Sequence, residues 1–249
     1  YKKLKGADGR PAFTIPLDLS SRDFNMTKLD NISFKEFLDN KGWDSKYLRW
    51  YANYCCRDDY GVTSDRVSAW AGIHYFASRV GVGANADAQT VLTWPEGNGW
   101  IVSQLESKYR SHIHGNSLVY SIEQKNGRIY SQVLEVGKKN VRGYVSRNLI
   151  FSAPRYVAVK VIRELKENPP GYLDSMGYAP WMVANVSLRS LPKGEGSPLS
   201  WDNVSFYSDS LGYIVATHQE LNPFPKATVI TYYLPLSHLD PKAARKQAL

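Results

Sequence analysis

Two short stretches of the sequence hold glycines at spacings that let a backbone approach a ligand closely. Residues 81–86, "GVGANA", fit the pattern G-x-G-x-x-A, which binds a dinucleotide where a strand passes into a helix. Residues 94–99, "WPEGNG", follow an extended run and precede an amphipathic helical segment. Because a predicted helix precedes residues 81–86 and a polar loop follows them, we interpret that stretch as a helix C-terminus. Residues 94–99 are the better candidate for a turn that approaches a ligand.

Histidines and cysteines are the next candidates for chemistry. His112 and His114 alternate on an extended stretch and could bind a metal, but no third ligand is near, so polar surface is the preferred interpretation. His74 lies on an apolar helix and is interpreted as a hydrogen-bonded core histidine. Cys55 and Cys56 are neighbours on a predicted helix and point about 100° apart, so no disulfide between them is expected.

Two polar clusters leave alternatives open. In "CCRDDYG", Arg57 precedes two aspartates, and an ion pair that stabilises the fold is favoured over a pocket lining. Residues 201–219 carry Trp201, Tyr213 and His218 on alternating stretches. These side chains could form a cage around a small molecule, or the two faces of a half-buried sheet.

The elements that must position these residues follow from hydrophobic periodicity and turn signals. The 249 residues are 43% hydrophobic, enough for one large core or two smaller ones. Ser33 and Glu36 have the spacing of a capping box, and Asn126-Gly127 separates two alternating runs, as in a hairpin. The predicted helices begin near residue 33, near residue 45, and cover residues 64–79, 98–109 and 155–166. The predicted strands lie in residues 117–124, 128–136, 144–154, 180–190, 203–208, 211–219 and 227–236.

The charge pattern restricts the partners. The net charge is +8 and the isoelectric point is near 9.3, but the basic residues are scattered. We interpret them as solvated surface, so no nucleic-acid partner is expected, while attraction to an acidic substrate stays open. No apolar run reaches the roughly 20 residues that span a bilayer. The chain starts on Tyr1 and stops in a helix that has barely begun, so we expect a piece of a longer protein.

The order of these pieces resembles the middle of the flavin-containing amine oxidase-like proteins, which include amine oxidases and relatives of protoporphyrinogen oxidase and phytoene desaturase. The resemblance rests on "WPEGNGWIVSQL", "LVYSI", the hairpin and "RNLIFSAP". In addition, "LRWYANYCCRDDYG", "SAWAGIHYFASR", "PWMVANVSL" and "LGYIVATHQ" resemble a bacterial branch of FAD-dependent oxidoreductases. Members of that branch often carry a twin-arginine export signal, which implies a periplasmic location.

The resemblance implies the cofactor FAD and a set of residues near it. Many amine oxidases place a lysine on a strand of the substrate domain, and Asn185 stands at that position here. An amide can orient a water but supplies no positive charge, so flavin-dependent redox chemistry is implied rather than amine oxidation as such. Asn185 and His218 are the catalytic candidates, and Trp201 and Tyr213 are the substrate-pocket candidates. The implied cofactor contacts are Trp94, Gly97, Asn98 and Gly99 near the flavin, Val119 near the adenine, and Ser152, Ala153 and Pro154 near the pyrophosphate.

Together these observations predict an α+β fold with a mixed sheet and flanking helices. Residues 1–90 and 166–249 are expected to form the helical and sheet parts of a substrate domain, and residues 91–165 the middle of an FAD-binding domain. The implied function is oxidation of a small organic substrate by hydride transfer to FAD in the intact protein. The family's N-terminal G-x-G-x-x-G is absent, so this piece alone is expected to bind FAD weakly and to be inactive. The alternative is a binding module that keeps the fold without a cofactor, and the missing lysine favours it slightly.

Overall fold

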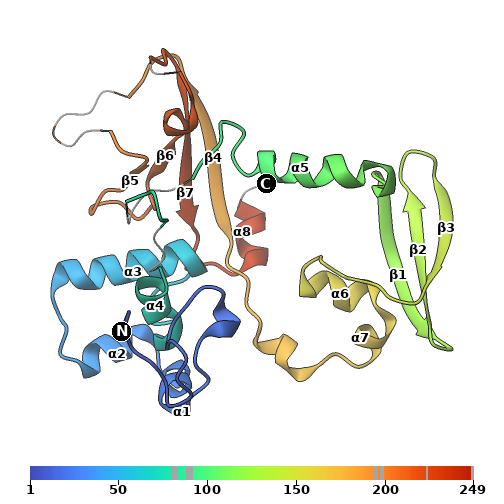
Figure 1. Cartoon of the computed structure of the whole chain (residues 1–249), viewed down its shortest axis with the longest axis horizontal. Helices are drawn as coiled ribbons and strands as arrows, with labels where there is room; N and C mark the ends of the chain where they lie inside the picture. The colour runs from blue at the N-terminus through green and yellow to red at the C-terminus, as the bar shows by residue number, and fades with distance from the viewer. Residues whose placement is uncertain (80–82, 88–91, 193–195, 197–198, 223, 248–249) are drawn as a thin grey trace. The chain divides into compact units, whose positions relative to one another are not determined.

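The computed structural model describes residues 1–79, 83–87, 92–192, 196, 199–222 and 224–247. The chain divides into two compact units (Figure 1). The first unit combines Tyr1–Gly97 with Tyr178–Leu249, and the second unit is Asn98–Gly177.

The predicted α+β class is confirmed, because helices accompany two sheets. The sheets differ from the single mixed sheet that the sequence predicts: every strand pair among the described residues is antiparallel. The parallel contact seen in this part of the chain is an isolated bridge between Ile122 and Ile162. Short turns impose this arrangement in the three-stranded sheet, since a parallel pair needs a long crossover between its strands. The helices after β3 lead to the other sheet instead.

Helices make up the N-terminal part of the first unit. Their aromatic and aliphatic side chains form the larger core, in which Phe34, Leu38 and Ile73 are buried. The helix expected at residues 64–79 begins later, because the Ser68 hydroxyl caps it by accepting a hydrogen bond from Ala71 N at 3.2 Å. The elements are η1 (Leu17–Leu19), α1 (Phe24–Thr27), η2 (Lys28–Asn31), α2 (Phe34–Asn40), α3 (Lys46–Tyr60) and α4 (Ala69–Ala77).

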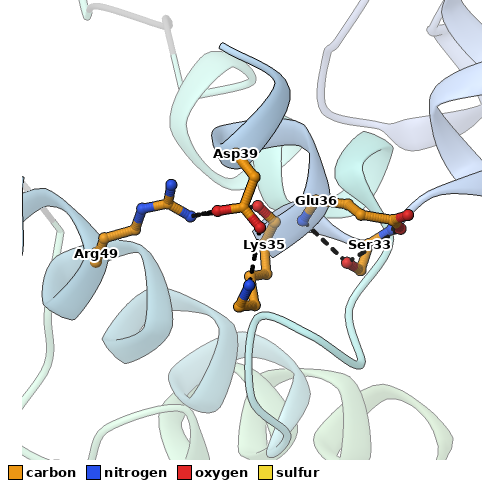
Figure 2. A network of polar contacts seen from close by, with 5 residues as sticks. All are labelled: Ser33, Lys35, Glu36, Asp39 and Arg49. Atoms are coloured by element: carbon orange, nitrogen blue, oxygen red, sulfur yellow. Dashed lines mark hydrogen bonds and ion pairs between the residues drawn. The ribbon is translucent and has the colours of Figure 1, made fainter. Parts of the chain in front are cut away.

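The predicted capping box at the start of α2 is confirmed. The Ser33 hydroxyl accepts a hydrogen bond from Glu36 N, and a Glu36 carboxylate oxygen accepts one from Ser33 N, each at 3.1 Å (Figure 2). On the same helix, Asp39 pairs with Lys35 at 2.8 Å and with Arg49 at 2.7 Å. The cap satisfies helix-end donors that would otherwise lack a partner, whereas the Lys35 pair is exposed to solvent.

We expect Ser33→Ala to lower the free energy of unfolding by about 1 kcal/mol, because it removes a cap at the N-terminus of α2. The measurement is urea unfolding followed by circular dichroism. Lys35→Ala is the matched control on the same helix, and we expect no measurable change from it. Equal losses in the two variants would contradict the role given to the cap.

The C-terminal part of the first unit is a four-stranded sheet in the order β4-β7-β6-β5. Its strands are β4 (Trp181–Leu188), β5 (Asp202–Asn203), β6 (Tyr213–Val215) and β7 (Thr228–Pro235), with η5 (Ala216–Gln219) and α8 (Pro241–Gln247) beside them. The strands expected at residues 203–208 and 211–219 are much shorter than predicted. The Asn203 amide donates to the carbonyl of Ser200 at 2.7 Å, and such local bonds compete with the sheet.

The second unit contains the predicted hairpin. Asn126 and Gly127 have φ of 52° and 68°, the left-handed pair that a tight two-residue hairpin turn requires, so this prediction is confirmed. Residues 147–154, expected to extend a strand, are not in one. The helix expected at residues 155–166 is interrupted at Ile162, which is extended and bridges to Ile122. The elements are α5 (Gly99–Tyr109), η3 (Arg110–His112), β1 (Ser117–Lys125), β2 (Arg128–Glu135), β3 (Asn140–Ser146), α6 (Arg155–Val161), α7 (Arg163–Glu167) and η4 (Gly171–Ser175).

Candidate functional site

The glycine turn before α5 has an open backbone. Gly97 N donates to the carbonyl of Trp94 at 2.8 Å, and Gly97 has φ of 58°, which favours glycine. Asn98 is the N-cap residue and Gly99 begins the helix. A Cβ built at Gly97 or at Gly99 would meet no described heavy atom within 4 Å. The residues around Gly97 and Gly99 therefore do not block the approach of a flat ligand to this backbone.

The other glycine-containing stretch, "GVGANA", is only partly described by the structure, because residues 80–82 lie outside the described residues. Its described end is a turn in which Ala86 N donates to the carbonyl of Gly83 at 3.4 Å. Helix α4 ends at Ala77, before this stretch. The strand that a dinucleotide loop needs before it is therefore not found in the described part of this region.

The remaining cofactor candidates lie in the second unit and are exposed. Val119 is on β1, next to a register shift between Val119 and Ser121. Ser152 and Ala153 precede α6 in an irregular segment, and Pro154 is the N-cap residue of that helix. All of them can be reached from solvent.

Asn185 lies on β4, and its side chain is exposed. The Thr231 hydroxyl donates to Asn185 Oδ1 at 2.8 Å. In the strand register Asn185 is opposite Thr231, Thr231 is opposite Ile214, and Ile214 is opposite Asp202. Residues that face one another across strands share a face of the sheet, so Tyr213, one residue before Ile214, is on the opposite face. The structure therefore does not bring Asn185 and Tyr213 together on one surface.

Trp201 and His218 are in contact. Their ring centroids are 4.8 Å apart, and His218 lies in the 3-10 turn η5 rather than in the expected strand. His218 Nδ1 donates to the carbonyl of Val215, so its Nε2 carries the lone pair in the neutral ring. That Nε2 atom is buried and has no hydrogen-bond partner among the described residues. Because Val215 N donates to the carbonyl of Trp201, strand alternation places Trp201 on the same face as Tyr213.

A polar contact between α3 and the sheet was not foreseen from the sequence. The Tyr54 hydroxyl donates to Asp202 Oδ2 at 3.0 Å, and burial together with the Asp202 charge raises the pKa of Tyr54. Burial also raises the pKa of Cys55 and of Cys56 to about 12 each. Both cysteines are free thiols and stay protonated at neutral pH, so they are poor nucleophiles. No sequence signal links residues 54 and 202, which are 148 positions apart.

The ion pair favoured within "CCRDDYG" does not form. Asp59 pairs with Arg79 at 3.2 Å, while Arg57 donates to the backbone carbonyl of Asp209. The prediction was wrong because residues one or two apart on a helix do not face each other.

The interpretation of His74 as a hydrogen-bonded histidine is confirmed, since its Nε2 lies 2.9 Å from the carbonyl oxygen of Thr14 and its ring stacks on Trp70. No three His, Cys, Asp or Glu side chains among the described residues are grouped so as to hold a metal. Likewise, none of the described helices has both the length and the apolar character needed to cross a membrane.

No family model matches the chain, and no curated protein matches it. Among solved structures, a triple mutant of putrescine oxidase, made as a structure-based redesign of cofactor binding, aligns with 90% of this chain at a TM-score of 0.59. The chain shares its fold with that oxidase. The sequence identity is 11%, so the likeness concerns the fold alone, and the chain spans 48% of that oxidase chain, about half its length.

Proposed function

We propose that this chain is part of an FAD-dependent, amine oxidase-like oxidoreductase that oxidises a small organic substrate by hydride transfer to the flavin. The observation that carries the proposal is the fold shared with putrescine oxidase over 90% of the chain. The sequence motifs that resemble flavin-containing amine oxidase-like proteins support it independently. In this proposal the first unit belongs to the substrate domain and the second unit to the middle of the FAD-binding domain.

The residues present fit a flavin. The backbone at Gly97 and Gly99 is open, and glycine is the residue that tolerates the left-handed conformation at position 97. Trp94 begins this turn and Asn98 lies between its two glycines. The exposed Val119 and residues 152–154 are the candidates for the adenine and pyrophosphate ends. When bound, FAD would supply the hydride acceptor.

The chain's own residues would orient the substrate. Asn185 lies on the other face of the sheet from Tyr213 and would not touch the same substrate; Thr231 engages its Oδ1 atom, which leaves its amide N–H groups to hold a water. Trp201 and His218 would form an aromatic wall with Tyr213 on the same sheet face. The His218 ring is held at Nδ1, so Nε2 is the atom that would accept a proton or a hydrogen bond there.

The visible spectrum of the purified full-length gene product tests the proposal. We expect a flavin absorption band at about 450 nm, a property of the cofactor itself. A folded, colourless full-length protein that cannot be reconstituted with FAD would contradict the proposal. That result would favour the binding module without a cofactor.

A matched pair of variants sharpens this test. Gly97→Val should lower the flavin content of the full-length protein, because a branched side chain would occupy the open backbone and strain the left-handed turn. Gly9→Val is the control, since Gly9 has φ of 74° and equally open surroundings but lies far from the cofactor candidates in sequence. Equal flavin content in the two variants would remove Gly97 from the cofactor site.

A further inference from the structure

A cavity of about 480 Å³ lies in the first unit between α3 and the end of β7. Its polar wall includes Asn53, Arg57 and Thr63, and its apolar wall includes Leu234 and Leu236. None of these residues belongs to the cofactor and substrate candidates described above.

Two side chains of the polar wall, those of Asn53 and Arg57, present hydrogen-bond donors. Asn53 and Arg57 are four residues apart on α3 and so lie on one face of it. Asn53 Oδ1 accepts a hydrogen bond from Ser64 N at 3.0 Å, which fixes the amide and leaves Nδ2 to donate. Arg57 uses one amino group on the carbonyl of Asp209, and among the described residues no carboxylate lies within ion-pair distance of its guanidinium. Several N–H donors are therefore available to a ligand.

The cavity lining carries one guanidinium, that of Arg57, and one carboxylate, that of Asp209. Burial lowers the pKa of Arg57, which means that the cation is partly withdrawn from water without full compensation. The Asp209 carboxylate also lies at the cavity, and its negative charge acts in the opposite direction by raising the pKa of Arg57. A bound carboxylate would supply the paired, two-bond contact that a guanidinium prefers and that the Asp209 carboxylate does not make with Arg57.

We propose that this cavity binds the carboxylate of a small organic acid that has an apolar body. The guanidinium of Arg57 and the amide of Asn53 donate to the carboxylate, and Leu234 and Leu236 contact the apolar body. This site does not depend on the proposed redox function.

Isothermal titration calorimetry of the chain tests the site with three probes: 4-methylpentanoate, its neutral amide 4-methylpentanamide, and inorganic phosphate. We expect saturable binding of the carboxylate, with the amide at least about tenfold weaker because it lacks the charge. Equal affinity for carboxylate and amide, or no detectable carboxylate binding, would overturn the proposal. Tighter binding of phosphate would overturn the assignment to carboxylates.

Variants on α3 and at Asp209 separate the site from a general charge effect. Arg57→Gln should weaken carboxylate binding about tenfold or more, whereas Arg49→Gln, on the same helix but outside the cavity, should not change it. Asp209→Asn should tighten binding by about two- to fivefold, because it removes a like charge and keeps the carbonyl that holds Arg57. Unchanged affinity in Arg57→Gln would refute the proposal.

Folding of each variant is verified by circular dichroism. If Arg57→Gln does not fold, Arg57→Lys replaces it, since lysine keeps the charge but loses the fork that pairs with a carboxylate. Carboxylate binding by Arg57→Lys as tight as that of the unaltered chain would then count against the site.

Discussion

Gly212→Ala is expected to lower the free energy of unfolding by about 4 kcal/mol, a large part of the stability of a domain. Gly212 has φ of 79°, and a Cβ there would lie 1.9 Å from the carbonyl oxygen of Asn203. Neither backbone can move away easily. The carbonyl of Gly212 accepts a hydrogen bond from Tyr233 N at 3.1 Å, and Asn203 pairs with Tyr213 in the sheet. Urea unfolding of the two proteins measures the difference.

Gly9→Ala separates the clash from the backbone conformation. Gly9 has φ of 74°, close to that of Gly212, but a Cβ at Gly9 would meet nothing within 4 Å. We expect this control to cost about 1–2 kcal/mol, the usual penalty of a left-handed residue that carries a Cβ. If the two variants lose the same free energy, the close approach of Asn203 to Gly212 does not contribute.

The second large effect is a loss of stability at alkaline pH. The pKa of Cys55 and of Cys56 is about 12 in the folded chain, against 9.0 for an ordinary thiol, because burial disfavours the thiolate. Above pH 9 the unfolded chain releases these protons while the folded chain keeps them. The unfolded state is therefore favoured as the pH rises from 9 towards 12, and the stability is complete below pH 9.

Urea unfolding at pH 7, 9 and 10 checks this. By pH 10 we expect a loss of about 1 kcal/mol for each thiol relative to pH 7. The matched control is the double variant Cys55→Ala and Cys56→Ala, whose stability should fall less over this range, although alanine lowers it at every pH. Half-buried tyrosines such as Tyr60, whose pKa desolvation raises to about 12, add to the loss mainly above pH 10. The same decline in both proteins would show that the thiols do not cause it.

Structure set by neighbouring residues could be predicted from the sequence. The capping box needs only Ser33 and Glu36, and the hairpin turn needs only Asn126 and Gly127, so each signal lies within a few positions. Features set by distant contacts were missed. The break at Ile162 coincides with a bridge to Ile122, a residue of β1, and helical periodicity carries no information about that bridge.

In the candidate site, too, local features could be predicted from the sequence and features set by distant contacts could not. The spacing of residues 201–219 suggested alternating strands, but η5 places His218 in a turn stacked on Trp201, and the strand register separates Asn185 from Tyr213. The open glycine turn at residues 94–99 could be anticipated because its geometry is local. A pocket lining was the alternative left open for Arg57, but the opposite wall of its cavity could not be anticipated, because it comes from the end of β7, far from α3 in the sequence.

The division of the chain has a consequence for its synthesis. The first unit is built from two stretches that flank the second, and contacts such as Tyr54–Asp202 join them. A ribosome must therefore complete the whole second unit before the helices of the first can meet their sheet. The hairpin of the second unit closes through local contacts and can form while the chain emerges. We expect the face of α3 that carries Tyr54 and Cys55, which packs against Leu211 in the finished unit, to stay uncovered in the nascent chain and to be the surface that chaperones bind.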